Sequence, residues 1–395
     1  MKSSNKIGIL TYHNVTNNGA VVQAYSLSQA LTREFGEYQV KILDYLPKTV
    51  RRHEFLKMFK PCKRVPLFYA KRYWLFRKFS EANLTMEKEL PRGEDIDRFA
   101  AFLNENQYQA LVVGSDNIWR ISDGRNSPGF PNIYWLTEQI KGRKIAYAAS
   151  AYGSKPTLVK NHKDTIQRHL DLFDLIGVRD EFTYGMVKDA GVNTNIPLRI
   201  VPDPTFLYTL QETDVRAKLS KERIDLDKPI LGILIYGRAE LSSAIREHYK
   251  SQGYQIVALG MYNPYADVNL GHILDPFEWA DAFKYLTFCI SDRFHGTIFC
   301  LKNKTPFISF EPRVVDSLKE SKIYSLLKSI DLTDCYAGRE GRDCQADLLL
   351  ERSAGLLEGW SNYIQRIEDG LERMQRESLE YIREIKRVVT NASNS

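Results

Sequence analysis

The segment 291–296, with the sequence Ser-Asp-Arg-Phe-His-Gly, places a guanidinium and an imidazole directly after an apolar run. The run 286–290 is typical of a buried strand, and residues 297–301 have the apolar spacing of a short helix. A turn from strand to helix exposes backbone N–H groups beside Gly296, where Arg293 and His295 would add positive charge. This pattern favours a phosphate site. The alternative is that His295 is a buried structural histidine and Arg293 pairs with a surface acid.

Two other polar turns follow apolar runs in the same way. Ser115 and Asp116 come after the run 110–113, and Arg179 comes after 175–178. Ligands bind beyond the carboxyl ends of strands in open parallel sheets, so we expect the three turns to converge on one cleft if two domains face each other. The three turns together supply two guanidiniums, an imidazole, a carboxylate and a hydroxyl. These groups are suited to binding a phosphorylated anion and to carrying out one proton transfer. The alternatives are a turn or helix cap for Asp116 and a structural ion pair for Arg179.

Strand and helix signals alternate along the 395 residues, which predicts an α/β fold with parallel sheets and two domains. We expect an N-terminal Rossmann-like domain over 1–210, a C-terminal one over 225–345 that carries the 291–296 turn, and helices over 346–395 that pack back across both domains. The predicted strands are 7–11, 40–44, 110–113, 144–149, 175–178, 230–235, 255–259, 286–290 and 307–310. The predicted helices include 20–35, 95–104, 157–172, 213–223, 239–252 and 276–285.

A basic insertion at about 47–90 interrupts this alternation and is expected to form a helical arm. Residues 47–79 contain eleven Lys and Arg against one acid, Glu54, so this stretch carries a charge of +10 and the rest of the chain carries −4. Aromatic residues are interleaved with the cations. Three interpretations stay open: surface helices with the aromatics packed inward, contact with an anionic lipid surface, and contact with a nucleic-acid backbone.

Several absences narrow the function. The apolar runs are of strand length, far below the roughly 20 residues that span a bilayer, and we expect no signal peptide before the first strand. The five cysteines are scattered, so we expect neither a disulfide framework nor a zinc site. Patterns for dinucleotide binding, for a P-loop and for a serine-hydrolase elbow are missing. We therefore expect a cytoplasmic protein with no metal and no cofactor.

At six places the chain resembles the polysaccharide pyruvyl transferase family. The matching blocks are 18–25, which begins with Asn18 and Gly19, then 113–119, 147–150, 178–180, 203–205 and 291–297. They appear in family order between about residues 6 and 310. Two positions depart from the family pattern. Asn117 stands where Gln is common, and Arg293 occupies a position that often holds Ser or another residue, which argues against a catalytic role for Arg293.

The resemblance implies a two-domain fold like that of GT-B glycosyltransferases, and transfer of pyruvate from phosphoenolpyruvate to a sugar as a ketal, with release of phosphate. It implies a phosphoenolpyruvate site lined by Asp116, Arg179, Phe294 and His295. We expect His295 to be the general acid and Arg179 to grip phosphate or carboxylate, while Asp116 accepts a proton from a sugar hydroxyl or orients it. The expected substrate-binding residues are Ser115, Arg293, Phe294, Gly296, Asn18 and Gly19.

Two other functions stay open. One is a nucleotide-sugar glycosyltransferase of GT-B fold, because such enzymes hold a donor diphosphate at a helix N-terminus. The other is a non-catalytic peripheral protein of a polysaccharide assembly complex, docked by residues 47–79. The expected partners are phosphoenolpyruvate and a sugar acceptor, lipid-linked or nucleotide-linked, with inner-leaflet membrane contact through 47–79 and no nucleic acid.

Overall fold

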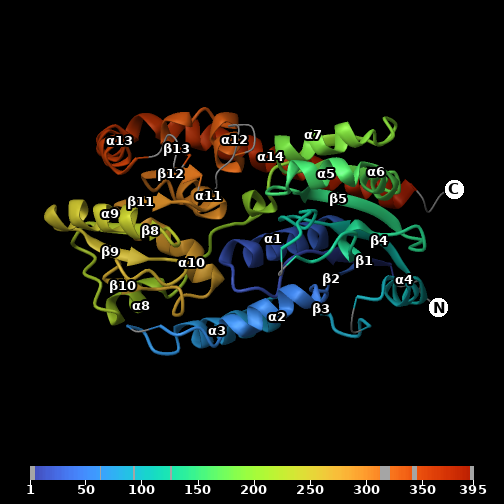
Figure 1. Ribbon diagram of the computed structural model, residues 1–395, viewed down its shortest axis with the longest axis horizontal. Helices are drawn as coiled ribbons and strands as arrows, with labels where there is room; N and C mark the ends of the chain where they lie inside the picture. The colour runs from blue at the N-terminus through green and yellow to red at the C-terminus, as the bar shows by residue number, and fades with distance from the viewer. Residues whose placement is uncertain are drawn as a thin grey trace.

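The computed structural model describes residues 5–62, 64–91, 94–124, 127–311, 321–339 and 345–391. Two parallel sheets, each covered by helices, lie side by side (Figure 1). The two parallel-sheet α/β domains predicted from the alternating pattern are therefore confirmed. None of the described helices is long and apolar enough to cross a bilayer.

The first sheet has seven strands in the order β3-β2-β1-β4-β5-β6-β7. Every pair is parallel, and the central strands are buried on both faces, which explains their continuous apolar runs. Its strands are β1 (Lys6–Leu10), β2 (Gln39–Leu43), β3 (Met86–Glu87), β4 (Tyr108–Val113), β5 (Arg143–Ala149), β6 (Leu175–Val178) and β7 (Leu198–Ile200). The main helices around it are α1 (Asn18–Phe35), α4 (Ile96–Glu105), α5 (Pro156–Asn161), α6 (Lys163–Leu170) and α7 (Glu181–Ala190).

The single helix predicted over 157–172 is two helices in the structure. His162 separates α5 from α6 with φ −107° and ψ 14°, and its ring packs on Phe130 with centroids 4.9 Å apart. The helix is therefore broken at His162, where the His162 side chain contacts the loop that carries Phe130. The apolar spacing of 157–172 does not reveal this break.

The second sheet has six strands in the order β10-β9-β8-β11-β12-β13, again all parallel. Its strands are β8 (Ile230–Leu234), β9 (Gln255–Ala258), β10 (Val268–Asn269), β11 (Phe288–Ser291), β12 (Phe307–Glu311) and β13 (Tyr336–Arg339). Its helices are α8 (Val215–Lys221), α9 (Ala239–Ser251), α10 (Pro276–Ala282), α11 (Phe294–Asn303), α12 (Lys322–Ser329) and α13 (Ala346–Glu358). Four strands were not predicted from the sequence, and all of them are short strands at the sheet edges: β3, β7, β10 and β13.

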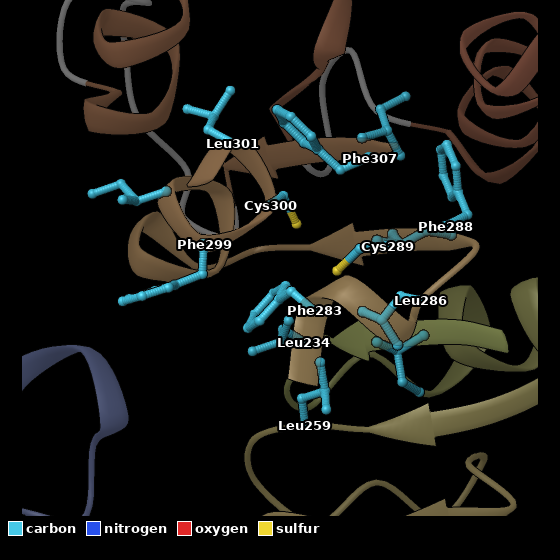
Figure 2. Close-up of a cluster of buried hydrophobic side chains, with 14 of the residues drawn as sticks. Leu234, Leu259, Phe283, Leu286, Phe288, Cys289, Phe299, Cys300, Leu301 and Phe307 are labelled. Carbon is cyan, nitrogen blue, oxygen red and sulfur yellow. The ribbon is translucent and has the colours of Figure 1, made fainter. Parts of the chain in front are cut away.

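The core of the second domain forms around β11 and α11 (Figure 2). The side chains of Cys289 and Cys300 lie in this apolar cluster, and both are free thiols. Burial raises the pKa of Cys300 well above its usual range. Cys62 and Cys335 are also free, and the fifth cysteine, Cys344, lies outside the described residues. This core anchors the strand and helix that flank the 291–296 turn.

The C-terminal helix α14 (Ile364–Asn391) joins the two domains. Ile367 and Met374 belong to the core of the second domain, whereas Tyr381 and Ile385 belong to that of the first. The Tyr381 hydroxyl donates a hydrogen bond to the carbonyl of Ala146 in β5 at 2.7 Å. The C-terminal helix α14 therefore packs back across both domains as predicted, whereas α13 contacts elements of the second domain.

The basic insertion forms helices α2 (Lys48–Lys57) and α3 (Phe68–Asn83), which run along the edge of both domains (Figure 1). Phe79 packs on Phe277 of the second domain with centroids 4.6 Å apart, and Phe68 packs on His272 at 4.9 Å. One face of α3 is therefore buried, as the inward-packing interpretation requires. Large apolar side chains elsewhere on the arm are exposed: Phe55, Leu56, Phe59, Leu67 and Trp74.

Candidate active site

The carboxyl ends of four strands meet at the interface of the two domains. β4 leads to Asp116, β6 to Arg179 and β7 to Asp203, while β11 leads into α11, whose second residue is His295. Arg179 Nη1 lies 3.0 Å from Asp203 Oδ2, and Arg179 Nη2 lies 3.8 Å from Asp116 Oδ1. His295 Nε2, from the other domain, lies 3.6 Å from Asp203 Oδ2. The three turns that sequence analysis singled out are thus close together in space.

Asp203, just before the short helix η2 (Pro204–Leu207), is the centre of this cluster. Its Oδ2 accepts hydrogen bonds from Arg179 Nη1 and from the Ser115 hydroxyl, both at 3.0 Å. Its Oδ1 accepts from the backbone N–H and the hydroxyl of Thr205. Burial alone raises the pKa of Asp203, but His295, Arg179 and these hydrogen bonds outweigh burial and hold the pKa well below its usual range. Asp203 is therefore a buried, permanent negative charge.

Arg179 is the buried cation of the site, with 2% of its side chain exposed. Its Nη2 donates to Asn117 Oδ1 at 2.9 Å, and the guanidinium lies over the Phe294 ring at 4.9 Å. Burial lowers the pKa of Arg179, but nearby carboxylates, Asp203 first, raise it overall. Its buried Nε has no hydrogen-bond partner among the described residues. One N–H of this cation is therefore uncommitted.

His295 is held against the first turn of α1 in the other domain. A Cβ atom on Gly19 would lie 2.1 Å from the His295 ring, so only glycine allows this approach. The His295 side chain is 12% exposed, and within the described part of the chain its Nε2 makes no hydrogen bond. The imidazole is thus positioned by both domains, with its buried Nε2 facing the Asp203 carboxylate.

Two helices begin at the site without a side-chain cap. The N-cap residues Asn17 of α1 and Arg293 of α11 make no capping hydrogen bond, whereas Asp180 caps α7. The free N–H groups and the helix dipole give each uncapped start a partial positive charge that suits an anion. Asn18, the first residue of α1, is also buried, and its Oδ1 has no partner in the described structure.

Asp116 and Ser115 differ in what they can offer a substrate. Asp116 has φ +80°, in the left-handed region that favours glycine, and 14% of its side chain is exposed. Its Oδ1 accepts from the backbone N–H of Asn117 at 2.8 Å. Ser115 is fully buried, and its hydroxyl lies 3.0 Å from both Asp203 Oδ2 and the carbonyl of Ala148. Asp116 is therefore accessible, while Ser115 supports Asp203.

Arg293 lies apart from the cluster. Its Nε pairs with Asp292 Oδ1 at 2.6 Å, its guanidinium lies 5.8 Å from the Tyr236 ring, and its side chain is 46% exposed. Phe294 and Gly296 are buried in the first turn of α11, beside His295. Helix α11 starts at Phe294 and not near residue 297, so the backbone of the whole Phe-His-Gly motif belongs to the helix start.

Sequence reasoning gave no role to two residues at this interface, although one of them, Asp203, stands in the matching block 203–205. Asp203 follows the end of a strand, as the other polar turns do, but β7 has only three residues and its apolar pattern is weak. Lys322, the first residue of α12, has its Nζ 5.5 Å from the centre of the Phe294 ring and 4.8 Å from that of Tyr152. No motif marks Lys322, because its place depends on packing between the domains. The described residues contain no group of three or more His, Cys, Asp or Glu that could hold a metal ion.

Comparison with known sequences identifies the family to which the chain belongs. The family described as polysaccharide pyruvyl transferase matches residues 17–313, which include every residue of the cluster from Asn18 to Gly296. The chain matches no curated protein.

Comparison with solved structures supplies the fold. A glycosyltransferase from Rickettsia africae is 10% identical, with a TM-score of 0.56 over 97% of this chain and 99% of that chain. A UDP-GlcNAc 2-epimerase from Neisseria meningitidis bound to UDP-GlcNAc is 9% identical, with a TM-score of 0.54 over 96% and 98%. A sucrose-phosphate synthase from Thermosynechococcus elongatus is 12% identical, with a TM-score of 0.53 over 98% and 100%. The predicted GT-B-like fold is confirmed.

Proposed function

Because this chain belongs to the polysaccharide pyruvyl transferase family, we propose that it transfers pyruvate from phosphoenolpyruvate to a sugar of a polysaccharide precursor as a ketal. The observation that carries the proposal is the meeting of His295 from one domain with Arg179 and Asp203 from the other. Two uncapped helix starts lie beside them. Phosphoenolpyruvate carries a phosphate and a carboxylate, and a buried cation with two positive helix ends suits such an anion.

The proposed reaction needs one acid and one place for the released protons. Protonated His295 gives a proton to the methylene carbon of the enol, which becomes a methyl group. C2 then forms bonds to two sugar oxygens, and its bond to the phosphate oxygen breaks. Of the two hydroxyl protons, one restores the proton of His295 and the other leaves with phosphate. Asp116 accepts or orients the first hydroxyl proton in this scheme.

The geometry refines the proposed role of Arg179. Its Nη1 and Nη2 already donate to Asp203 and Asn117, so a free bidentate fork is not available in this arrangement. We therefore propose that Arg179 stabilises the donor through its buried charge and the uncommitted Nε–H. The backbone N–H groups at the starts of α1 and α11, including those near Gly19 and Gly296, would hold phosphate or carboxylate oxygens.

The test is phosphate release from phosphoenolpyruvate in the presence of a panel of lipid-linked and nucleotide-linked sugars, with product mass as a second readout. His295→Gln should lower kcat by about 10²–10⁴-fold, the usual contribution of a general acid, without loss of folded protein. His248→Gln is the matched control, because this histidine is half-buried on α9, pairs with Gln252 and should leave the rate unchanged. Full activity of His295→Gln would refute the proposed acid.

A second candidate function is nucleotide-sugar transfer, which the GT-B fold also supports. The uncapped start of α11 in the second domain is the kind of place where such enzymes hold a diphosphate. Calorimetric titration separates the two functions. Binding of phosphoenolpyruvate with little binding of UDP supports pyruvyl transfer, and the reverse supports glycosyl transfer.

A further inference from the structure

A cavity of about 440 Å³ opens directly beside the cluster on the side of Asp116. Asp116 and Asn117 form one end of it, and the two residues also contact Arg179. The loop before α1 supplies Tyr12 and Asn17 to its wall. This cavity therefore shares atoms with the proposed donor site but extends away from it into the first domain.

The basic insertion supplies another part of the cavity wall. Val50, Glu54 and Lys57 line it, and their spacing of four and three residues places them on one face of α2. Glu54 Oε2 accepts hydrogen bonds from the backbone N–H and hydroxyl of Thr16 at 2.9 and 2.7 Å. These bonds attach α2 to the loop before α1, so the wall is held at a set distance from the site.

The lining of the cavity is polar but balanced in charge. Two carboxylates, Asp116 and Glu54, stand against two cations, Lys57 and Arg120, and Glu54 pairs with Lys57. The remaining lining combines hydroxyl and amide groups and the ring of Tyr12 with a smaller apolar part from Val15, Val50 and Pro128. The cavity on the other face of α2, of about 750 Å³, has instead an excess of Lys and Arg. Of the two, only the balanced cavity suits an uncharged ligand with many hydroxyls.

We propose that this cavity binds the acceptor as an uncharged pyranose, and that helix α2 of the insertion determines which sugar fits. The inference rests on the proposed pyruvyl transfer, since the sugar is placed with two hydroxyls towards Asp116 and the donor. The volume is in the range of small-ligand sites, and amides, hydroxyls and one aromatic ring are the groups that such sites use to orient a sugar. The inserted helix is then part of the acceptor site.

The test fills the cavity from α2, which carries none of the proposed catalytic residues. Val50→Trp should raise KM for the acceptor about tenfold or more, while the calorimetric affinity for phosphoenolpyruvate and the melting temperature stay near those of the wild type. Leu56→Trp is the matched control, because Leu56 lies on α2, is 52% exposed and lines neither cavity. In this variant the acceptor KM and the affinity for phosphoenolpyruvate should both stay unchanged. Val50→Leu is a milder variant, to be used if the larger one fails to fold. An unchanged acceptor KM in folded Val50→Trp overturns the proposal.

A second measurement separates this inference from the proposed function. Saturation-transfer NMR with methyl glucopyranoside, methyl galactopyranoside and methyl mannopyranoside reports sugar binding without turnover. We expect at least one of them to bind the wild type and to lose its signal in Val50→Trp. If a sugar binds in this way but phosphoenolpyruvate does not bind, the cavity assignment holds and pyruvyl transfer is wrong. If phosphoenolpyruvate binds and the variant leaves sugar binding unchanged, the cavity assignment is wrong.

Discussion

At the scale of single residues, the site depends on one buried carboxylate. Asp203 joins Arg179, Ser115 and His295, which come from three different segments of the chain. A buried cation such as Arg179 is costly without a nearby negative charge, so Asp203 stabilises the fold as well as the geometry of the site. Its role is to position these groups, since its own oxygens are occupied by protein donors.

Asp203→Asn should lower the free energy of unfolding by about 3–5 kcal/mol at pH 7, because Arg179 remains buried without its nearest counter-charge. The pKa of Asp203 is depressed in the folded state, so its contribution is complete above the usual value of 3.8 and is lost as the pH falls below it. The stability difference between wild type and variant should therefore be constant from pH 7 to about pH 4.5. Below that pH it should shrink, by at most about 1.4 kcal/mol per pH unit. Urea unfolding at several pH values measures it.

Asp227→Asn is the control for that experiment, because Asp227 is exposed and should change stability little at any pH. A difference for Asp203→Asn that stays constant down to pH 3 would show that the carboxylate titrates normally in the folded protein.

At the scale of elements, the basic arm has one face packed on the second domain and one face exposed. Three of its cations contact the second domain: Lys60 donates to the Tyr236 hydroxyl, Arg64 to the carbonyl of Pro264, and Arg72 to that of Gly271. Lys71, Trp74 and Lys78, at spacings of three and four residues, form one exposed face along α3, and exposed Leu67 directly precedes the helix. We propose that this outward face is the part of the arm that contacts an anionic membrane surface.

Removing the charges of that face should weaken membrane binding without disturbing the domain interface. Lys71→Gln with Lys78→Gln should lower binding to vesicles of phosphatidylglycerol and phosphatidylcholine by roughly tenfold or more, at about 1 kcal/mol per charge. Lys160→Gln with Lys163→Gln changes the same charge on exposed residues of α5 and α6 and should have little effect. Vesicle sedimentation measures both, and equal binding of the two double variants would argue against the outward face. Arg64 is not used in this charge-removal test because its side chain donates to the carbonyl of Pro264 in the second domain. Lys63 is not used because it lies outside the described residues.

At the scale of the whole molecule, the site exists only because the two domains are held together. Helix α14 reaches the cores of both, and the arm crosses their other edge (Figure 1). Tyr381 of α14 is fully buried against β6, where a Cβ on Gly177 would lie 2.6 Å from its ring. This close contact identifies Tyr381 as a main anchor of α14 on the first domain.

Tyr381→Ala should lower the free energy of unfolding by about 3–5 kcal/mol, the usual cost of removing a buried aromatic ring. The lost hydrogen bond to Ala146 adds to this cost. Leu379→Ala, on the same helix but 38% exposed, should stay within about 0.5 kcal/mol of the wild type. Guanidinium unfolding followed by circular dichroism compares the two. Equal stability of the two variants would mean that α14 is not anchored through Tyr381.

The sequence by itself determined the fold class, the order of most strands and helices, and the turns that hold Asp116, Arg179 and His295. Apolar periodicity and strand ends are local properties, so they can be read from neighbouring residues. Only the tertiary structure decided that Asp203 joins these groups, that Arg293 lies apart from them, and that α2 forms a wall of the cavity beside Asp116. Those contacts connect residues up to about ninety positions apart, as between Asp203 and His295. They depend on how α14 and the arm hold one domain against the other, which no local pattern records.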